Sequence, residues 1–292
     1  MAERAWQGGT DGTSWMHRAL VRIVRHVPLW LMYGFVAVFV VPFYFVFSKG
    51  YKPTYHYFRR RMGYNPVSAF FMVYRNHCRF SQVILDRFYM FSGGKFELDV
   101  ENYNLYQELA DGEDGFIILS AHVGCYELAG YSLVATKKRF NALAFGEEAE
   151  TIVENRQRLF EDTNINIIPV KDDLSHLFAI NNALDNGESV SFPSDRLVGK
   201  QRTVTCEFLG APAQFPMGPF ALAAQRDLPV LTVNVMKASP KRYKVYVNRL
   251  QKEGEKREER IDSYVRQYAG RLEEVLHLYP EQWFNYYEFW ND

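Results

Sequence analysis

Residues 116–130 have the sequence FIILSAHVGCYELAG, the clearest indication of the fold in this chain. Its first five residues form a short apolar run that indicates a strand buried on both faces. Residues 126–135 follow with a helical pattern. A buried strand that passes into a helix through a short turn is the building unit of an α/β sheet, and Gly124 allows that turn to be tight.

The same alternation of strands and helices continues on both sides of this stretch. Further strands are predicted at 165–170, 190–192 and 230–235, and one nearer an edge at 243–247. Helices are predicted at 66–91, 151–162, 174–186 and 261–278. We therefore predict an α/β fold in which a central mixed, mostly parallel sheet is flanked by helices, within a catalytic domain of residues 93–292.

His122 and Glu127 lie in the turn between the first predicted strand and its helix. Ligands of open α/β sheets gather beyond the carboxyl ends of the strands. A histidine there is placed to act as a general base, and a nearby carboxylate can fix its tautomer and stabilise the imidazolium. A histidine five residues before a glutamate also occurs in purely structural settings, so the pair gains its meaning from the motifs that follow it.

Several motifs follow His122 and Glu127 along the chain. They are ENR at 154–156, LDNGE at 184–188, PSDR at 193–196, FLGAPA at 208–213, PMGPFALA at 216–223 and PEQWF at 280–284. With these motifs in this order, the chain resembles the lysophospholipid acyltransferase superfamily, whose signature is a histidine, four residues and an acid. More narrowly, it resembles the bacterial lipid A late acyltransferases, the lauroyl and myristoyl transferases.

The resemblance implies a glycerolipid acyltransferase-like fold and the transfer of a fatty acyl group from a thioester to a hydroxyl or amine of a membrane lipid or lipid A-like glycolipid. His122 would take the acceptor's proton, and Glu127 would orient the imidazole. Arg156 would offer a planar fork to a phosphate. Backbone N–H groups at the turn around Gly218 and Pro219 would stabilise the tetrahedral oxyanion. No metal and no cofactor are implied, because acyl carrier protein or CoA carries the acyl group as a co-substrate.

The chain departs from the family pattern at two places. Family members usually carry Asp-Gln where this chain has Asp195-Arg196, and they tend to have TPTG where it has FPMG at 215–218. We expect Asp195 and Arg196 to bind substrate, with Arg196 meeting a phosphate or carboxylate of the acceptor or else forming a salt bridge to a neighbouring acid. The acceptor stays open among a lipid A-like glycolipid, a lysophospholipid, an amino-acid lipid and an aryl polyene-type pigment lipid.

Residues 1–92 form a separate N-terminal region, with an irregular arm up to about Thr13. From Val27 to Ser48 no residue carries a formal charge, and as a helix this run would span roughly 33 Å, close to the thickness of a bilayer core. Pro42 interrupts the run, and arginines and lysines flank it on both sides. We expect a helix, or a helix pair broken at the proline, that contacts the cytoplasmic face of a bacterial inner membrane. The alternative is a buried helical hairpin.

Charge and cysteine content exclude some classes of protein. The 34 basic and 34 acidic side chains give a formal net charge of zero, so no global field attracts nucleic acid. Locally, the basic runs 137–139 and 241–242 are candidates to meet an acidic carrier protein. Three scattered cysteines predict neither a disulfide framework nor a zinc cluster.

Rival functions of two other classes, a hydrolase and a non-catalytic adaptor, fit the sequence less well. A cysteine hydrolase would pair Cys125 with His122, but the sequence offers no third orienting group. A serine hydrolase is disfavoured because the G-x-S-x-G elbow is missing from the sequence. A non-catalytic membrane adaptor is the second rival, against which the intact His122 and Glu127 argue.

Overall fold

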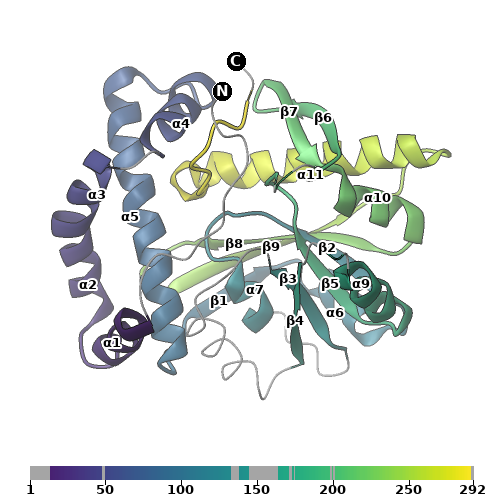
Figure 1. Cartoon of the computed structure of the whole chain (residues 1–292), viewed down its shortest axis with the longest axis horizontal. Coiled ribbons are helices and arrows are strands. Elements are labelled where there is room, and N and C mark those ends of the chain that lie inside the picture. The colour runs from purple at the N-terminus through teal and green to yellow at the C-terminus, as the bar shows by residue number, and fades with distance from the viewer. Residues whose placement is uncertain are drawn as a thin grey trace.

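The computed structural model describes residues 14–47, 50–132, 138–144, 164–170, 173, 175–197, 199 and 201–290. Its centre is a seven-stranded sheet in the order β1-β9-β8-β2-β5-β3-β4 (Figure 1). The strands are β1 Glu97–Glu101, β2 Phe116–Ser120, β3 Phe140–Ala144, β4 Ile165–Pro169, β5 Ser189–Pro193, β8 Val230–Lys237 and β9 Arg242–Leu250. Neighbouring strands are parallel except β8 and β9, which are antiparallel. The predicted mixed, mostly parallel sheet is confirmed.

Strand β2 lies in the middle of this sheet. All five residues of β2 are buried, because strands β8 and β5 lie on its two edges and helices cover both faces. Ile117 and Leu119 face one hydrophobic cluster, and Phe116 and Ile118 face the other. This two-sided burial explains why the strand reads as a continuous apolar run in the sequence.

Helices complete the two faces (Figure 1). They are α6 Tyr103–Asp111, α7 Glu127–Ser132, α9 Ser175–Asp185, α10 Met217–Arg226 and α11 Arg257–Leu278. Side chains of α9, α10 and α11 join the cluster on the Ile117 face, and those of α6 and α7 join the cluster on the Phe116 face. The helices predicted at 174–186 and 261–278 are confirmed, whereas the one predicted at 151–162 lies outside the described residues. A separate hairpin, β6 Thr203–Phe208 and β7 Ala211–Pro216, packs against α11.

The N-terminal region is helical as far as the structure describes it. Its helices are α1 Ser14–Val24, α2 Leu29–Phe35, α3 Val41–Phe47, α4 Tyr51–His56 and α5 Pro66–Phe91, with π-helical turns at Val36–Val40 and Tyr57–Arg61. The predicted helix 66–91 is confirmed, and it begins where Asn65 accepts a hydrogen bond from the backbone N–H of Ser68 at 2.9 Å. Val73 and Phe88 on this helix are buried, whereas Phe70 is exposed.

The apolar run is helical but not regular. Backbone N–H of Val41 bonds to the carbonyl of Val36, five residues back, and the next such donor would be Pro42, which has no N–H. The carbonyl of Ala37, which receives no hydrogen bond from Pro42, accepts one from the hydroxyl of Tyr74 on α5. Among the described residues, no helix has both the length and the apolar character needed to cross a membrane.

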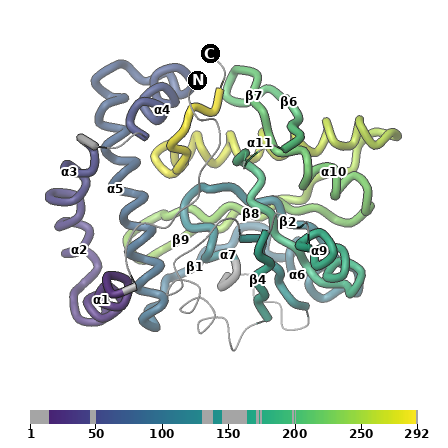
Figure 2. Tube along the Cα trace, in the orientation of Figure 1, coloured from purple at the N-terminus to yellow at the C-terminus, as the bar shows by residue number. Residues whose placement is uncertain are grey.

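The C-terminal segment, residues 279–290, packs against helices that lie about two hundred residues before it in the chain (Figure 2). The hydroxyl of Tyr57 donates to the carbonyl of Pro280, and the amide of Asn76 donates to the carbonyls of Glu281 and Trp283. Residues Tyr57, Phe58 and Val73 share one hydrophobic cluster with Ile117 of the sheet. The sequence pattern changes near residue 92, but one hydrophobic cluster contains residues from both sides of that position.

Candidate active site

The turn after β2 carries His122, and its backbone conformation depends on Gly124. Gly124 has a φ of +49°, and a Cβ placed on it would lie 2.0 Å from the carbonyl oxygen of Val235 in β8. Any other residue would clash with backbone atoms there, so glycine is required for the turn to pack against the sheet. The N–H of Cys125 donates to the same carbonyl at 2.8 Å. The expected role of Gly124 in a tight turn is confirmed.

His122 is hydrogen-bonded to Asp195, which lies 73 residues further along the chain. Its Nδ1 is 2.7 Å from Asp195 Oδ1, and its backbone N–H donates to Asp195 Oδ2 at 3.0 Å. The sheet register explains this meeting, because Ser120 at the end of β2 pairs with Pro193 at the end of β5. Each functional residue lies two positions beyond the end of its strand, so parallel neighbours bring the two side chains together.

In this structure Asp195, and not the expected Glu127, makes the hydrogen bond to the imidazole of His122. Glu127 is the first residue of α7, and its Oε1 lies 3.1 Å from Nη1 of Arg87 on α5. Both side chains of this ion pair are largely buried. Glu127 therefore ties the start of α7 to α5, and any contribution to catalysis remains a prediction.

The surroundings of His122 favour its neutral form. Burial lowers the pKa of the imidazole, the nearby Arg196 lowers it further, and Asp195 opposes both. Burial raises the pKa of Asp195, but the attraction of His122 and Arg196 and the hydrogen bonds from His122 outweigh it and hold that pKa below its usual range. An ionised Asp195 beside a neutral imidazole places the proton on Nδ1 and leaves the lone pair on Nε2.

The open side of His122 is its Nε2 edge. The side chain is 18% exposed, and no residue in the described part of the chain is hydrogen-bonded to Nε2. The ring of Tyr126 stands edge-on to the imidazole with 5.4 Å between ring centroids, and it is itself exposed. A substrate hydroxyl or amine approaching beside Tyr126 would meet a basic nitrogen.

The C-terminal segment contributes residues for which we predicted no role. Trp283 is buried, and its indole Nε1–H donates to Asp195 Oδ2 at 3.3 Å. The backbone N–H of Phe284 donates to the carbonyl of His122 at 3.1 Å, and that of Gly124 donates to the carbonyl of Gln282 at 2.9 Å. The PEQWF motif of the sequence was the available signal, but nothing in its spacing shows which residues it meets.

Asp195 and Arg196, both expected to bind substrate, have different surroundings. The side chain of Asp195 is fully buried, and both of its oxygens are engaged by His122 and Trp283. A direct contact of Asp195 with substrate stays a prediction. Arg196 is half-buried, donates through Nη2 to the carbonyl of Phe284, and lies close enough to lower the pKa of His122.

The remaining predicted site residues are Gly218, Pro219 and Arg156. Gly218 and Pro219 lie in the first turn of α10, and space around the Cα of Gly218 is open. Within the described residues, no hydrogen bond joins Gly218 or Pro219 to His122 or Asp195. Their oxyanion role stays a prediction. Arg156 lies outside the described residues.

Burial bears on two other residues that the sequence singled out, Cys125 and Lys138. Cys125 is buried, and burial together with the nearby Glu127 raises the pKa of its thiol far above the range in which a thiolate forms. This argues against a cysteine nucleophile. In the basic run 137–139, Lys138 is buried and its Nζ donates to the carbonyl of Asp114, so it does not face a carrier protein. Lys137 lies outside the described residues.

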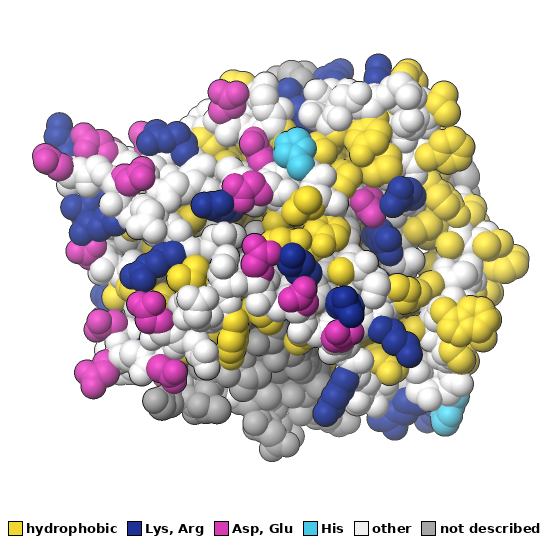
Figure 3. Space-filling view, turned by 180° about the vertical axis from the view of Figure 1, so that it is seen from behind, with side chains coloured by type: hydrophobic (Ala, Val, Ile, Leu, Met, Phe, Trp, Pro, Cys, Tyr) yellow, Lys and Arg dark blue, Asp and Glu magenta, His cyan; other side chains and the backbone are white. Residues whose placement is uncertain are grey.

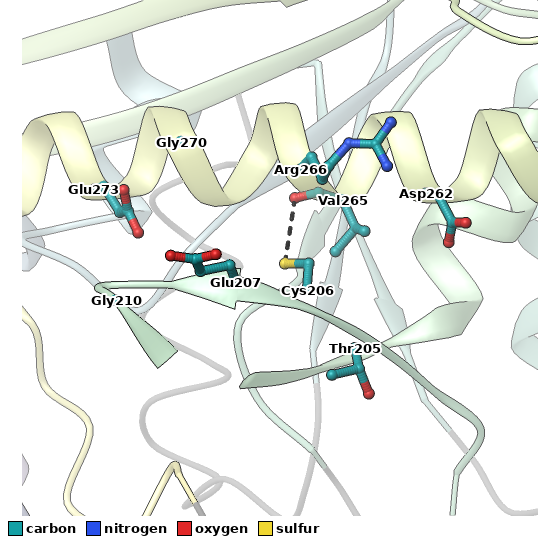
Figure 4. Close-up of a pocket in the computed structure, with 9 residues that line it drawn as sticks. All are labelled: Thr205, Cys206, Glu207, Gly210, Asp262, Val265, Arg266, Gly270 and Glu273. Carbon is teal, nitrogen blue, oxygen red and sulfur yellow. Dashed lines mark hydrogen bonds between the residues drawn. The ribbon is translucent and has the colours of Figure 1, made fainter. Parts of the chain in front are cut away.

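A hollow of about 450 Å³ lies elsewhere, between β6 and α11 (Figure 4). Glu207 and Glu273 lie at one end, Asp262 and Arg266 at the other, and the thiol of Cys206 points at the carbonyl of Val265. None of the predicted site residues lines it. The position of His122 at the carboxyl end of β2 therefore defines the candidate active site.

Comparison with known proteins identifies the family of this chain. The sequence model of a family described as "Bacterial lipid A biosynthesis acyltransferase" matches residues 94–291, more than half of the chain. The protein is thus an acyltransferase of lipid biosynthesis. It belongs to the bacterial lipid A biosynthesis acyltransferase family, as its motifs led us to expect.

Among solved structures, the chain is similar to the 1-acyl-sn-glycerophosphate (LPA) acyltransferase PlsC from Thermotoga maritima. The two share 14% sequence identity with a TM-score of 0.41, over 91% of this chain and 98% of that one. A likeness this distant assigns no residue. No curated protein sequence matches the chain.

Proposed function

We propose that this enzyme moves a fatty acyl group from the thioester of acyl carrier protein or CoA to a hydroxyl or amine of a membrane lipid, with a lipid A-like glycolipid as the first candidate acceptor. The observation that carries the proposal is the state of His122. Its Nδ1 is held by Asp195, its pKa is lowered, and its Nε2 has no hydrogen-bond partner among the described residues. A neutral imidazole with one free nitrogen is the requirement for a general base.

The reaction follows from this arrangement. Nε2 of His122 takes the proton of the acceptor hydroxyl or amine as its oxygen or nitrogen attacks the thioester carbonyl. The tetrahedral intermediate then expels the thiolate, which receives the proton from the imidazolium and leaves as a thiol. Asp195 supports the positive charge that His122 carries between the two steps. General-base help of this kind is worth about 10²–10⁴-fold in rate.

Other residues take supporting roles in the proposal. Glu127, through Arg87, fixes the start of α7 and with it the turn that carries His122. The N–H of Gly218 at the start of α10 is a candidate donor to the oxyanion. Arg156 is a candidate to bind a phosphate on the donor or acceptor. Arg196 is a candidate to select the acceptor, because its guanidinium lies close to His122.

We further propose that the N-terminal helices hold the enzyme on the cytoplasmic face of the bacterial inner membrane. Helix α1 exposes Trp15, Met16 and Ile23. Exposed large apolar side chains continue along the next helices and the start of α5: Trp30, Leu31, Phe35, Val38, Phe39, Val40, Phe43, Tyr44, Val67, Phe70 and Phe71. In the rear view these helices form the right-hand side of the molecule, which is largely hydrophobic (Figure 3).

Positive charge accompanies this apolar surface. Arg18 and Arg22 on α1 and Arg25 in the turn after it are exposed, and the two arginines of the helix lie on the same face as Trp15. A helix that offers apolar side chains next to arginines fits the boundary of a bilayer with anionic head groups. So many exposed large apolar side chains on one side of the molecule are otherwise unfavourable for a protein in water. The membrane would then bring a lipid acceptor to the enzyme.

Acyl transfer with purified protein tests the proposed function. The full-length chain in detergent is given radiolabelled acyl carrier protein thioester or acyl-CoA in separate reactions, with total bacterial membrane lipid as acceptor. We expect label to appear in one lipid class, which mass spectrometry identifies, and His122→Ala to serve as the blank. Release of label only as free fatty acid, or no transfer from either donor, would overturn the proposal.

A further inference from the structure

We propose that Trp283 is a positioning residue for the reaction, which holds Asp195 through its indole N–H and so completes a chain of three groups ending at Nε2 of His122. This inference rests on the proposed role of His122 as the base. It assigns a function to the C-terminal PEQWF motif, which lies 160 residues from the catalytic turn.

The geometry at Asp195 carries the proposal. Oδ1 faces His122 Nδ1 at 2.7 Å, while Oδ2 accepts the backbone N–H of His122 at 3.0 Å and the indole N–H of Trp283 at 3.3 Å. With Oδ2 held from two directions, the carboxylate cannot rotate, and Oδ1 stays aligned with the imidazole. A buried carboxylate engaged in this way is both oriented and stabilised in its ionised form.

Trp283 is itself fixed on every side. Its ring lies 5.1 Å from the ring of Tyr57, 5.1 Å from that of Phe289 and 5.6 Å from that of Trp290, measured between centroids. Its backbone pairs with Val123 in an isolated bridge, directly beside His122. These contacts hold the indole where its N–H donates to Asp195 Oδ2.

The preceding residue anchors the same segment to the sheet. The side chain of Gln282 accepts from the backbone N–H of Lys237 at 2.8 Å and donates to the carbonyl of Lys237 at 2.9 Å. Its carbonyl accepts from Gly124 at 2.9 Å. Gln282 thus locks the segment at the end of β8, and Trp283 transmits that rigidity to the acid of the catalytic pair.

The indole N–H also affects proton affinity at His122. Other titratable groups that face this pair are Tyr126 beside the imidazole, Arg196 next in the chain, Tyr268 of α11 and Tyr287 of the C-terminal segment. Arg196 is the one cationic group among these, and the hydroxyls of Tyr268 and Tyr287 stay neutral because burial and Asp195 raise their pKa values. Removing the indole N–H leaves more negative charge on Asp195 available to the imidazolium, so the pKa of His122 should rise.

The experiment replaces only the donor atom. Benzothienylalanine, which carries sulfur where indole carries N–H, is inserted at position 283, with Trp283→Phe as a second variant. Trp290 is the matched control, because its indole N–H also donates at 3.3 Å, to the carbonyl of Phe208, and its ring contacts Trp283. Acyl-transfer kcat and kcat/KM are measured against pH, together with the thermal unfolding midpoint.

We expect the change at 283 to lower kcat roughly 3- to 10-fold and to move the acid limb of kcat/KM upward by on the order of 0.5 pH unit, as the loss of one hydrogen bond implies. The same change at 290 should leave the limb in place. The role of Trp283 would be overturned if the variant at 283 kept the wild-type kcat and the wild-type acid limb of kcat/KM. An equal shift of the acid limb in the variant at 290 would overturn it as well. Both outcomes leave the proposed function standing as long as His122→Ala is inactive; an active His122→Ala would instead remove His122 as the base.

Discussion

Asp86 and Asp195 are both buried aspartates beside a basic side chain, yet they lie in very different settings. Asp86 on α5 binds Nζ of Lys237 and the hydroxyls of Tyr33 and Tyr243, and neither the acid nor the lysine is exposed at all. Asp195 binds His122, whose side chain is 18% exposed. The first set of contacts joins α2, α5, β8 and β9, whereas the second ends at the surface.

The difference shows that burial alone does not define a reactive group. Burial raises the pKa of Asp86 and lowers that of Lys237, each against the attraction of its partner, but no atom of that pair can reach a substrate. Lys237 is further enclosed by the rings of Tyr33, Phe96 and Tyr243. We therefore interpret Asp86 as holding the N-terminal helices to the sheet, and Asp195 as serving the open imidazole.

The largest effect should follow from Asp195→Asn. An amide at this place can donate to Nδ1 and so favour the tautomer that carries its proton on Nε2, where the base is needed. We expect kcat to fall by roughly 10²–10⁴-fold, measured as initial rates of acyl transfer. Asp185→Asn, at an exposed acid paired with Arg226, should keep its rate. A fall of less than about threefold for Asp195→Asn would place the imidazole's support elsewhere.

Asp86→Asn should have the opposite pattern, with a loss of stability and little loss of turnover. Removing the acid leaves Lys237 buried without its counter-charge, which costs about 3–5 kcal/mol in the free energy of unfolding. Urea denaturation measures this loss, and kcat is measured well below the unfolding midpoint. Glu101→Gln, in an exposed pair with Lys244, should cost less than about 1 kcal/mol. A collapse of kcat at unchanged stability would end the distinction between the two aspartates.

Arg196→Gln should shift the pH dependence without abolishing the reaction. Arg196 lowers the pKa of His122, so its removal should raise that pKa. Because the neutral imidazole is the active form, the acid limb of kcat/KM should move to higher pH, and the variant should be weaker than wild type below about pH 6.5. Comparing several acceptors in the same assay tests acceptor choice. An unchanged limb with an equal loss for all acceptors would indicate a structural salt bridge instead.

The smallest effect is expected at the exposed apolar surface of α1. Trp15→Ser removes an aromatic ring that is 71% exposed on α1, beside the arginines of that helix. Binding to vesicles of anionic phospholipid, measured by sedimentation, should weaken several-fold. Phe178→Ser is the control, because this ring is 80% exposed but lies on α9. Equal binding by wild type and both variants would contradict a membrane role for α1.

Much of the fold follows from local sequence pattern. The run at 116–120 predicted β2 because burial on both faces leaves no polar position in the strand. The helix at 66–91 was equally clear, since Asn65 and Pro66 provide a cap and a first turn. Strand β1 shows no apolar run in the sequence, because it lies at the edge of the sheet. Its exposed acids Glu97, Asp99 and Glu101 alternate with two half-buried apolar residues.

The site was harder to predict because its members are distant in sequence. Glu127 was chosen as the partner of His122 because it is near in the chain, but as the first residue of α7 it bonds to Arg87. Asp195 could have been found from the sheet order, since it lies two residues past a strand that neighbours β2. Trp283 could not, because its position depends on the packing of the whole C-terminal segment.

The rate of acyl transfer by His122→Ala tests the central claim most directly. Initial rates are measured with the donor and acceptor that the wild-type enzyme uses, on protein whose thermal unfolding midpoint matches wild type. Loss of the base predicts a fall in kcat of at least about a hundredfold with the fold intact. A folded His122→Ala variant that transfers the acyl group at close to the wild-type rate would contradict the account.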